Sequence, residues 1–277
     1  MIIDGKTLAH ELRVSLKERI STSQKRYRLA FVIAEATREI TTFVTLKQQF
    51  AQDIGVETSI LTLEQLRRST EALLALLLHA TREFDGVVVQ LPLARGMDTE
   101  ALLNIYPLSH DVDVLGNTAF EQYREGKLPF DPPVVGAMAE ILRREGIRLA
   151  GYRVLVIGEG RLVGAPAAVW ATRMGATVKV VNKSTQNLDA WLCGADVIMC
   201  GAGAPGIVRP DNIKEGVIIL DAGTSEQAGV LKGDADPACA EKARIFTPTP
   251  GGIGPISVAK VFENLLTLAD LKEKRKR

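Results

Sequence analysis

The chain has 277 residues, 46% hydrophobic and 24% charged, so it is long enough for two domains and can bury a sizeable core. Its 34 Lys and Arg residues nearly balance 33 Asp and Glu, which gives no charge signature of a nucleic-acid or acidic partner. We find no apolar signal segment and no apolar run of membrane-spanning length, so we expect a soluble, cytoplasmic protein that binds no membrane. Cys193, Cys200 and Cys239 lack metal-type spacing, which predicts reduced thiols and no metal site.

The first third of the chain predicts helices that alternate with apolar strands. Leucine and isoleucine recur every four residues over 8–20, which predicts an amphipathic helix. Strands are expected at 29–34, 56–61 and 87–89, with helices at 42–54 and 63–80 between them. Continuously apolar strands separated by helices are typical of a parallel sheet covered on both faces. We therefore predict an α/β fold.

The second part of the chain predicts another series of the same kind. From about residue 117 to 133 the sequence is polar and proline-rich, and a helix to residue 144 follows it. Strands are then expected at 153–157, 177–181, 197–200 and 217–220.

The last helix carries an apolar stripe between Val258 and Leu266 and needs a surface to pack on. We expect this C-terminal helix to return to the first domain and to end in a solvated basic tail at 272–277. The predicted domains are therefore a discontinuous one, residues 1–130 and 256–277, and a second one, residues 131–255.

A glycine-rich loop, Gly-Glu-Gly-Arg-Leu-Val-Gly over 158–164, joins the 153–157 strand to a predicted helix. Glycines at such a junction allow a tight turn and a close approach of the backbone to a pyrophosphate, whose charge sits at the helix N-terminus. The loop predicts a Rossmann-type dinucleotide-binding domain, although a plain strand-to-helix turn would need similar glycines. The predicted cofactor-binding residues are Gly158, Glu159, Gly160, Val163, Gly164, Lys183 and Ser184.

The residues after the 177–181 strand bear on the choice of dinucleotide. An acidic residue there usually accepts from the ribose 2′-hydroxyl of NAD, and none is present. Lys183 and Ser184 could instead contact a 2′-phosphate, which favours NADP over NAD. Glu159 argues the other way, because a carboxylate near the ribose would repel a phosphate. Both charged residues could also be solvated loop residues.

Lys47 is the first candidate catalytic residue. With Phe43, Phe50 and Ile54 it falls on one face of a helix that we expect Thr41 or Thr42 to cap. Apolar surroundings would lower the pKa of the amine, which could then act as a base or proton relay near neutral pH. The alternative is a lysine that extends to solvent from the edge of a core stripe.

Gln90 ends an apolar strand, just before Leu91 and Pro92. The carboxyl ends of strands are where ligands bind in open α/β sheets, and a glutamine can both donate to and accept from a substrate or a lysine. A cap for the following loop is an equally good interpretation.

Asp111 and Asp113 flank Val112, so one carboxylate is expected to face inward and one outward. The inward one could hold the amide and amine edge of a ligand. An Asx turn explains the pair equally well.

Together these motifs resemble the methylenetetrahydrofolate dehydrogenase/cyclohydrolase family. The family patterns Y-V-x-x-K, V-Q-L-P-L-P, K-D-V-D-G-F, V-G-x-P and G-D-V correspond to residues 43–47, 89–94, 110–115, 163–166 and 233–235. The most specific match is T-P-V-P-G-G-V-G-P-M-T, which corresponds to 247–257. The motifs follow family order, so the resemblance covers essentially the whole chain.

The departures identify a divergent member. Phe43 replaces the family tyrosine, His110 replaces a lysine, and Val114-Leu115 replaces Gly-Phe. The usual G-R-S or G-A-S of the nucleotide loop is Gly-Glu-Gly at 158–160, and P-C-T-P is not recognisable at 131–134. Three polar residues are retained, namely Lys47, Gln90 and Asp113.

The resemblance implies a two-step reaction of one-carbon metabolism and purine biosynthesis at one cleft between the domains. NADP-dependent oxidation of 5,10-methylenetetrahydrofolate gives 5,10-methenyltetrahydrofolate, which is hydrolysed to 10-formyltetrahydrofolate. Lys47, tuned by its apolar face and by Gln90, would handle the proton during hydrolysis, and Asp113 would hold the pterin ring. The implied substrate-binding residues are Phe43, Gln90, Leu91, Pro92, Asp113, Gly251, Gly252 and Pro255.

The resemblance also implies a homodimer that pairs through the dinucleotide domain. Two other functions stay open at this point. One is a catalytically silent paralogue that still binds folate or dinucleotide, which Phe43 and the altered nucleotide loop motivate. The other is a different two-domain NADP oxidoreductase that acts on an amino or hydroxy acid.

Overall fold

The computed structural model describes residues 1–63, 69–227 and 229–276, which pack into two compact units. The three-stranded unit contains the described residues of 10–133 and 258–277, and the five-stranded unit contains 1–9 and 134–257. The sequence analysis had assigned residues 1–9 to the first domain. They pack with the five-stranded unit because the Ile3 amide donates to the Phe246 carbonyl at 2.9 Å, and the Phe246 amide donates to the Met1 carbonyl at 2.9 Å.

The three-stranded unit is built on parallel strands in the order β2-β1-β3. Their bounds are β1 (Arg28–Ile33), β2 (Glu57–Thr62) and β3 (Gly86–Gln90). Side chains of β1 alternate between two buried clusters, with Leu29 and Phe31 on one face and Ala30 and Val32 on the other. Burial on both faces explains why the apolar runs of β1 and β3 are continuous, whereas the edge strand β2 is partly exposed and has a mixed sequence.

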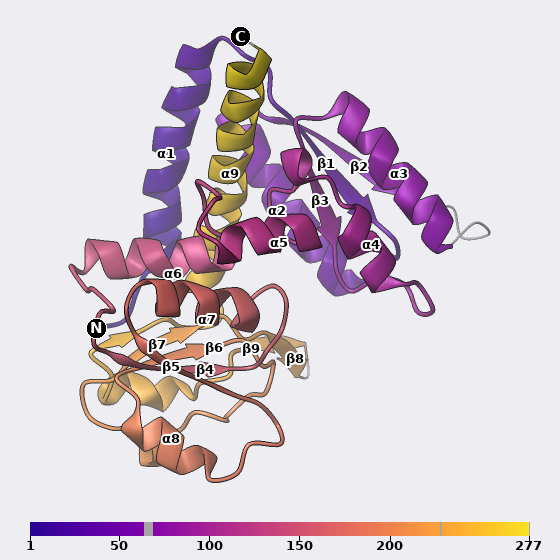
Figure 1. The fold of residues 1–277 in the computed structure, drawn as a ribbon. Helices are drawn as coiled ribbons and strands as arrows, with labels where there is room; N and C mark the ends of the chain where they lie inside the picture. Colours follow the sequence, from indigo (N-terminus) through magenta and orange to yellow (C-terminus); the bar gives the residue numbers. More distant parts are fainter. Residues whose placement is uncertain (64–68, 228, 277) are drawn as a thin grey trace. The chain divides into compact units, whose positions relative to one another are not determined.

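Helices cover both faces of this sheet (Figure 1). The helices with residues in the unit are α1 (Gly5–Ser23), α2 (Arg38–Ile54), α3 (Thr70–Glu83), α4 (Thr99–Ile105), α5 (Asn117–Arg124) and α9 (Ile253–Lys276). Residues of α1, α2 and α9 share the cluster of Leu29, whereas residues of α3 and α4 share that of Ala30. The expected return of the C-terminal helix is confirmed, since Phe262 and Leu265 pack in the cluster of Leu29.

Two predictions in this unit need correction. The stretch 117–133 was expected to lack regular structure, but α5 occupies its first half and buries Ala119 and Tyr123. The helix predicted over 63–80 begins at Thr70, where the Ser69 side chain accepts from the Ala72 amide at 3.2 Å. Residues 64–68 of that prediction lie outside the described residues.

The five-stranded unit has an all-parallel sheet in the order β10-β7-β6-β4-β5. The strands are β4 (Arg153–Ile157), β5 (Thr177–Val181), β6 (Val197–Cys200), β7 (Ile218–Asp221) and β10 (Ile245–Phe246). The helices are α6 (Pro133–Arg144), α7 (Gly164–Arg173) and α8 (Leu188–Gly194), and β8 (Ser225–Gln227) pairs antiparallel with β9 (Val230–Lys232). The sequence analysis missed β8, β9 and β10, which are too short to carry a pattern.

The strand order of this sheet reverses beside β4. The chain runs from β4 to β5 at one edge and then crosses to β6 on the other side of β4. In doubly wound sheets such a reversal opens a crevice at the carboxyl ends of the two central strands, where ligands bind. The crevice predicted here therefore lies at the ends of β4 and β6.

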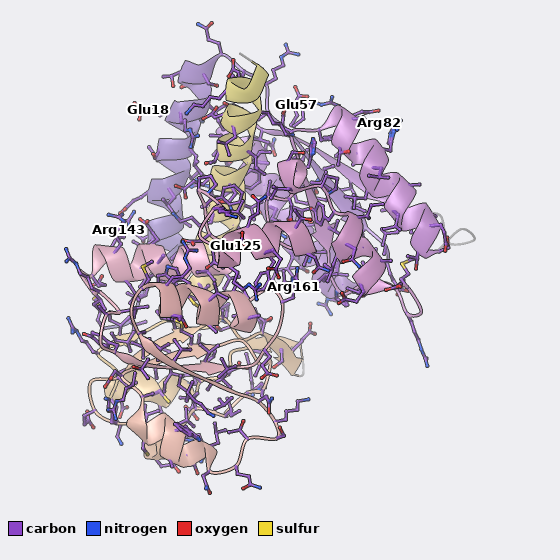
Figure 2. All side chains as sticks on the ribbon, in the orientation of Figure 1. Glu18, Glu57, Arg82, Glu125, Arg143 and Arg161 are labelled. Atoms are coloured by element: carbon purple, nitrogen blue, oxygen red, sulfur yellow. The ribbon has the colours of Figure 1, made fainter. Side chains whose placement is uncertain are left out.

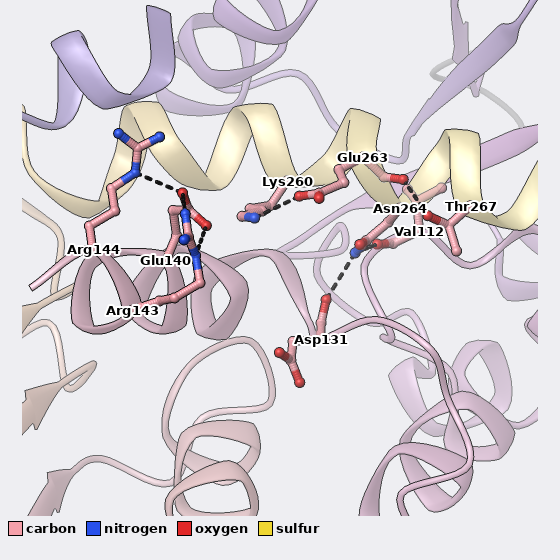
Figure 3. A network of polar contacts seen from close by, with 9 residues as sticks. All are labelled: Val112, Asp131, Glu140, Arg143, Arg144, Lys260, Glu263, Asn264 and Thr267. Atoms are coloured by element: carbon pink, nitrogen blue, oxygen red, sulfur yellow. Dashed lines mark hydrogen bonds and ion pairs between the residues drawn. The ribbon is translucent and has the colours of Figure 1, made fainter. Parts of the chain in front are cut away.

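Charged side chains such as Glu18, Glu57 and Arg82 project from the surface (Figure 2). Glu140 of α6 is an exception, because it is 8% exposed and accepts from Arg143 and Arg144 of the same helix (Figure 3). All three thiols are free, two of them buried and Cys193 exposed. Among the described residues, no helix is long and apolar enough to cross a membrane.

Candidate active site

Helix α2 places Lys47. It begins at Arg38, and its cap is Thr37, whose hydroxyl accepts from the Ile40 amide at 3.2 Å. The predicted caps Thr41 and Thr42 are wrong, because both lie inside the helix and donate to main-chain carbonyls four residues back.

The buried face of α2 contains Ile40, Val44, Ala51 and Ile54. Lys47 is half-buried and lies on the same face, because it follows Val44 by three residues and precedes Ala51 by four. Phe43 had been expected on the same apolar face, but its side chain is 38% exposed and points out of the core. The expected apolar face of α2 therefore includes Val44 and Ala51, whereas Phe43 is exposed.

Lys47 lies beside Gln90, the last residue of β3. The Lys47 Nζ donates to Gln90 Oε1 at 3.1 Å. Register with β1 holds Gln90 opposite Ile33, at the carboxyl edge of the sheet. The structure thus brings together two of the predicted catalytic side chains, which are 43 residues apart in the chain.

Asp113 completes a charged group with Lys47. Burial lowers the pKa of the Lys47 amine, and the Asp113 carboxylate partly offsets this. Burial raises the pKa of Asp113 in turn, and the Lys47 ammonium opposes that rise. Burial therefore favours the neutral form of each group, and the charge of its partner opposes that effect.

Asp111 has a structural role that the sequence analysis left open. It is fully buried and accepts from the Leu115 amide at 3.0 Å and from the Gly116 amide at 2.7 Å. Burial raises its pKa to about 7, against these two hydrogen bonds. The turn interpretation therefore fits Asp111, while Asp113 is the carboxylate that interacts with Lys47.

Asn264 is a residue that sequence reasoning missed. It lies in α9, is 3% exposed, and donates to the carbonyl of Val112 at 2.9 Å and to that of Asp131 at 2.9 Å (Figure 3). The first bond holds the backbone immediately before Asp113. A polar residue within an otherwise apolar helical stripe was the signal that could have found it.

His110 stands where the family has a lysine. Its Nδ1 lies 2.9 Å from Ser109 Oγ. Burial, and the charge of Lys272, lower its pKa to about 4. The imidazole is therefore neutral at neutral pH and does not replace the positive charge of the lysine.

The backbone next to Asp113 is strained. Val114 has φ 57°, a left-handed conformation that a β-branched residue rarely adopts, at the position where the family pattern has glycine. Strain of this kind persists where the surrounding structure fixes the chain, often at functional sites.

We expect Val114→Gly to destabilise the protein less than Val112→Gly, by about 1–2 kcal/mol in the free energy of unfolding. Both changes delete a buried valine side chain, but only the first relieves a left-handed backbone. Urea unfolding of the two variants measures the difference. Equal losses would show that position 114 carries no backbone strain.

Gly251, Gly252 and Pro255 belong to the five-stranded unit, whereas the other predicted substrate-binding residues belong to the three-stranded unit. Gly251 has φ 105°, and a Cβ on Gly252 would come within 2.6 Å of the Pro248 carbonyl oxygen. Gly251 is therefore suited by its left-handed backbone, and Gly252 by close packing. The close approach of the Gly251 and Gly252 backbone to a ligand stays a prediction.

The glycine-rich loop connects β4 to α7, at the predicted crevice. Gly158 has φ 99°, and a Cβ there would lie 2.8 Å from the Gly201 carbonyl oxygen at the end of β6. A Cβ on Gly164 would overlap the Gly158 carbonyl oxygen, and one on Gly201 would overlap the Val163 side chain. Nothing lies within 4 Å of a Cβ built on Gly160. Close packing thus explains two of the three loop glycines, and the third leaves open space that a ligand could occupy.

Asp234 supports the neighbouring loop and was not assigned a role from sequence. It is fully buried, and it accepts from the Ala202 amide at 2.7 Å and the Ala204 amide at 2.6 Å. These bonds fix the loop after β6. Burial raises the pKa of its neighbour Asp221 to about 6, despite bonds from the Ala235 and Gly223 amides. The match of residues 233–235 to the family pattern G-D-V was the feature of the sequence that could have identified Asp234.

The fold and site define a two-unit α/β oxidoreductase with a dinucleotide-binding sheet. The family profile described as the tetrahydrofolate dehydrogenase/cyclohydrolase catalytic domain matches residues 3–113, and that of the NAD(P)-binding domain matches 132–273. The chain belongs to the tetrahydrofolate dehydrogenase/cyclohydrolase family.

Individual relatives agree with this assignment. The bifunctional protein FolD of Campylobacter curvus is 33% identical over 285 residues, which cover 99% of this chain and 97% of that protein. The Trypanosoma brucei dehydrogenase-cyclohydrolase, solved with NADP cofactor and an inhibitor, is 30% identical with a TM-score of 0.92 and 98% of each chain covered. The Campylobacter jejuni enzyme is 28% identical with a TM-score of 0.92, covering 98% of this chain and 99% of its own.

Proposed function

We propose that this chain oxidises 5,10-methylenetetrahydrofolate with NADP and hydrolyses the methenyl product to 10-formyltetrahydrofolate. The observation that carries the proposal is the hydrogen bond from Lys47 to Gln90, beside the carboxylate of Asp113. A silent paralogue would have no need to keep a partly desolvated lysine that donates to Gln90 and interacts electrostatically with Asp113. A different two-domain oxidoreductase is disfavoured by the family profiles, which match both halves of the chain.

The folate would bind at the carboxyl edge of the three-stranded sheet. Gln90, which donates weakly to the Leu91 carbonyl at 3.4 Å, has a second amide hydrogen for a ligand. Asp113 would accept from the amide and amine edge of the pterin. Exposed Phe43, one helical turn before Lys47, and exposed Pro92 would offer apolar surface to the ligand.

Lys47 would manage the proton in the second step. With its pKa lowered, the amine has a neutral fraction that can take a proton from the attacking water. Gln90 orients the amine, and Asp113 stabilises the ammonium that forms. When the ring opens, the Lys47 ammonium would return the proton to the ring nitrogen whose bond to the carbon breaks.

The dinucleotide fits the five-stranded unit. The open space at Gly160 and the N-terminus of α7 at Gly164 suit a pyrophosphate, with Gly158 and Val163 shaping the loop. When bound, the nicotinamide accepts the hydride that leaves the methylene carbon. The residues of the chain contribute the positioning of the two reactants, a contribution that needs no side-chain acid or base.

NADP is proposed because Lys183, an exposed cation two residues after the end of β5, could contact a 2′-phosphate. We expect Lys183→Ala to weaken NADP binding more than NAD binding, by about ten- to a hundredfold, since only NADP offers the phosphate. Binding titrations with both dinucleotides measure this. Equal losses would place Lys183 away from the ribose.

The test of the reaction is to incubate purified chain with methylenetetrahydrofolate and either dinucleotide, and to follow reduction of the dinucleotide by absorbance. Reduction of NADP is the expected result. If neither dinucleotide is reduced, the dehydrogenase proposal is wrong.

We further propose that the chain acts as a homodimer in one-carbon metabolism in the cytoplasm, where 10-formyltetrahydrofolate supplies purine biosynthesis. We expect the reaction to need no metal. Among the described residues, no group of three or more His, Cys, Asp or Glu side chains is arranged to hold a metal ion.

A further inference from the structure

Glu159 occupies an unusual place for an acidic residue of the nucleotide loop. It lies two residues after the end of β4, yet its Oε2 accepts from the side-chain amide of Asn182 at 3.1 Å, and Asn182 directly follows β5. The two strands are neighbours, and the Gly158 amide donates to the Val181 carbonyl at 2.8 Å. The carboxylate of Glu159 therefore lies at the carboxyl end of β5, although its backbone is in the loop after β4.

The orientation of Asn182 is fixed by its own turn. Its side-chain Oδ1 accepts from the Ser184 main-chain amide at 3.0 Å and from the Ser184 hydroxyl at 2.7 Å, and its main-chain amide donates to Thr185 Oγ1 at 3.0 Å. With Oδ1 committed to these donors, the NH₂ group is the one that faces Glu159. The carboxylate is thus held by a donor that cannot rotate away without breaking the turn.

In dinucleotide-binding sheets, the carboxyl end of the second strand is where an acidic residue accepts from the adenosine ribose 2′-hydroxyl of NAD. Here β5 is that strand, and Asn182 stands at its end without a carboxylate. Glu159 places a carboxylate at this position, although it comes from the loop after β4 and not from β5. A carboxylate at this point accepts from a hydroxyl and repels a phosphate.

We propose that Glu159 is a specificity-determining residue that binds the ribose 2′-hydroxyl, so that the enzyme accepts NAD as well as NADP. This inference rests on the proposed dinucleotide site. The positioning residue is Asn182, which acts through Glu159.

Two neighbours set the balance between the cofactors. Lys183 attracts a 2′-phosphate, as argued above. Ser184 cannot donate to the phosphate while its hydroxyl hydrogen is given to Asn182 Oδ1. One attracting cation therefore opposes one repelling carboxylate, and the net discrimination between NADP and NAD is small. The sequence analysis weighed Glu159 as a charge that repels a phosphate or as a solvated loop residue, because the bond to Asn182 cannot be seen in the order of the residues.

The test measures binding of NADH and NADPH to the full chain without folate, by fluorescence titration of wild type, Glu159→Gln, Asn182→Ala and the control Glu215→Gln. Glu215 is exposed in the same unit, before β7. For Glu159→Gln we expect the ratio of the NADH to the NADPH dissociation constant to rise by about ten- to a hundredfold, since a charge-assisted bond to the hydroxyl is lost and repulsion of the phosphate ends. Asn182→Ala should shift the ratio in the same direction by less, and Glu215→Gln should leave it unchanged.

An unchanged ratio in Glu159→Gln, or an equal change for both dinucleotides, would overturn the inference. So would a wild-type protein that binds NADPH more than a hundredfold more tightly than NADH. If neither dinucleotide binds, both the inference and the proposed function are wrong. If both bind with the expected ratios but folate is not oxidised, only the proposed reaction is wrong.

Discussion

Replacing Lys47 by methionine should nearly abolish hydrolysis of methenyltetrahydrofolate, by about 10²–10⁴-fold in kcat. Methionine preserves most of the length and apolar contact of the side chain but cannot carry a proton. We expect the fold to tolerate this change, because it removes the hydrogen bond from Lys47 to Gln90 but leaves the buried Val44 and Ala51 side chains of the same helix in place.

The dehydrogenase step should fall much less in Lys47→Met. Hydride transfer needs the donor and acceptor carbons to be close together and correctly oriented, and it needs no proton from the lysine. The variant should therefore affect this step only through the placement of the substrate. The matched control is Lys17→Met, an exposed lysine of α1, which should change neither activity. If Lys47→Met retains hydrolysis at the control level, the assignment of the base is wrong.

The pH dependence of hydrolysis offers a second readout of the same residue. Because burial lowers the pKa of Lys47, its neutral form accumulates at a lower pH than that of an ordinary lysine. Hydrolysis should therefore rise with pH through the lowered pKa, and Lys47→Met should lose this rising limb. A limb that survives in the variant would belong to another group.

The second large effect is expected from Gly164→Ala. A Cβ at this position overlaps the Gly158 carbonyl oxygen, a backbone atom that moves only if the whole loop moves. Overpacking of this kind costs about 1–3 kcal/mol, so we expect dinucleotide affinity to fall by about ten- to a hundredfold. Fluorescence titration with NADPH measures the loss.

Gly194→Ala is the matched control for this variant. Gly194 ends α8 in the same unit, lies outside the left-handed region, and has nothing within 4 Å of a built Cβ. The Gly194→Ala variant should bind NADPH with the same affinity as the wild-type protein. Equal affinities of Gly164→Ala and Gly194→Ala would show that the loop tolerates the methyl group and that close packing does not shape the pyrophosphate site.

Much of the fold could be predicted because its central strands are buried on both faces. The strands at 153–157 and 197–200 were predicted with the bounds that the structure has, since their apolar runs end at glycine. The edge strand at 177–181 was also predicted with its bounds, although it contains Lys179 and is partly exposed. Helix α5 was missed because it buries only Ala119 and Tyr123 and is otherwise polar. Strand β10 was missed because two residues carry no pattern.

The candidate site could be predicted only in part, for a similar reason. The rule that ligands bind at the carboxyl ends of parallel strands identified Gln90 as a candidate. Its nearness to Lys47, which the structure shows, was implied by the family resemblance. The cap of α2 could not be located, because Thr37, Thr41 and Thr42 are equally good capping residues in sequence.

Long-range contacts stayed hidden for a different reason. The bond from Asn264 to the Val112 carbonyl spans 152 residues, and the bond from Asn182 to Glu159 depends on the pairing of β4 with β5. No local pattern encodes such contacts, because they exist only once the strands and α9 have packed.

The most direct test of the central claim is hydrolysis of methenyltetrahydrofolate by the purified wild-type chain without dinucleotide. This measurement isolates the step that requires the Lys47, Gln90 and Asp113 group. We predict loss of the methenyl absorbance well above the uncatalysed rate, together with formation of 10-formyltetrahydrofolate. Loss at the uncatalysed rate, from a folded protein that binds folate, would contradict the claim that this group is a working cyclohydrolase site.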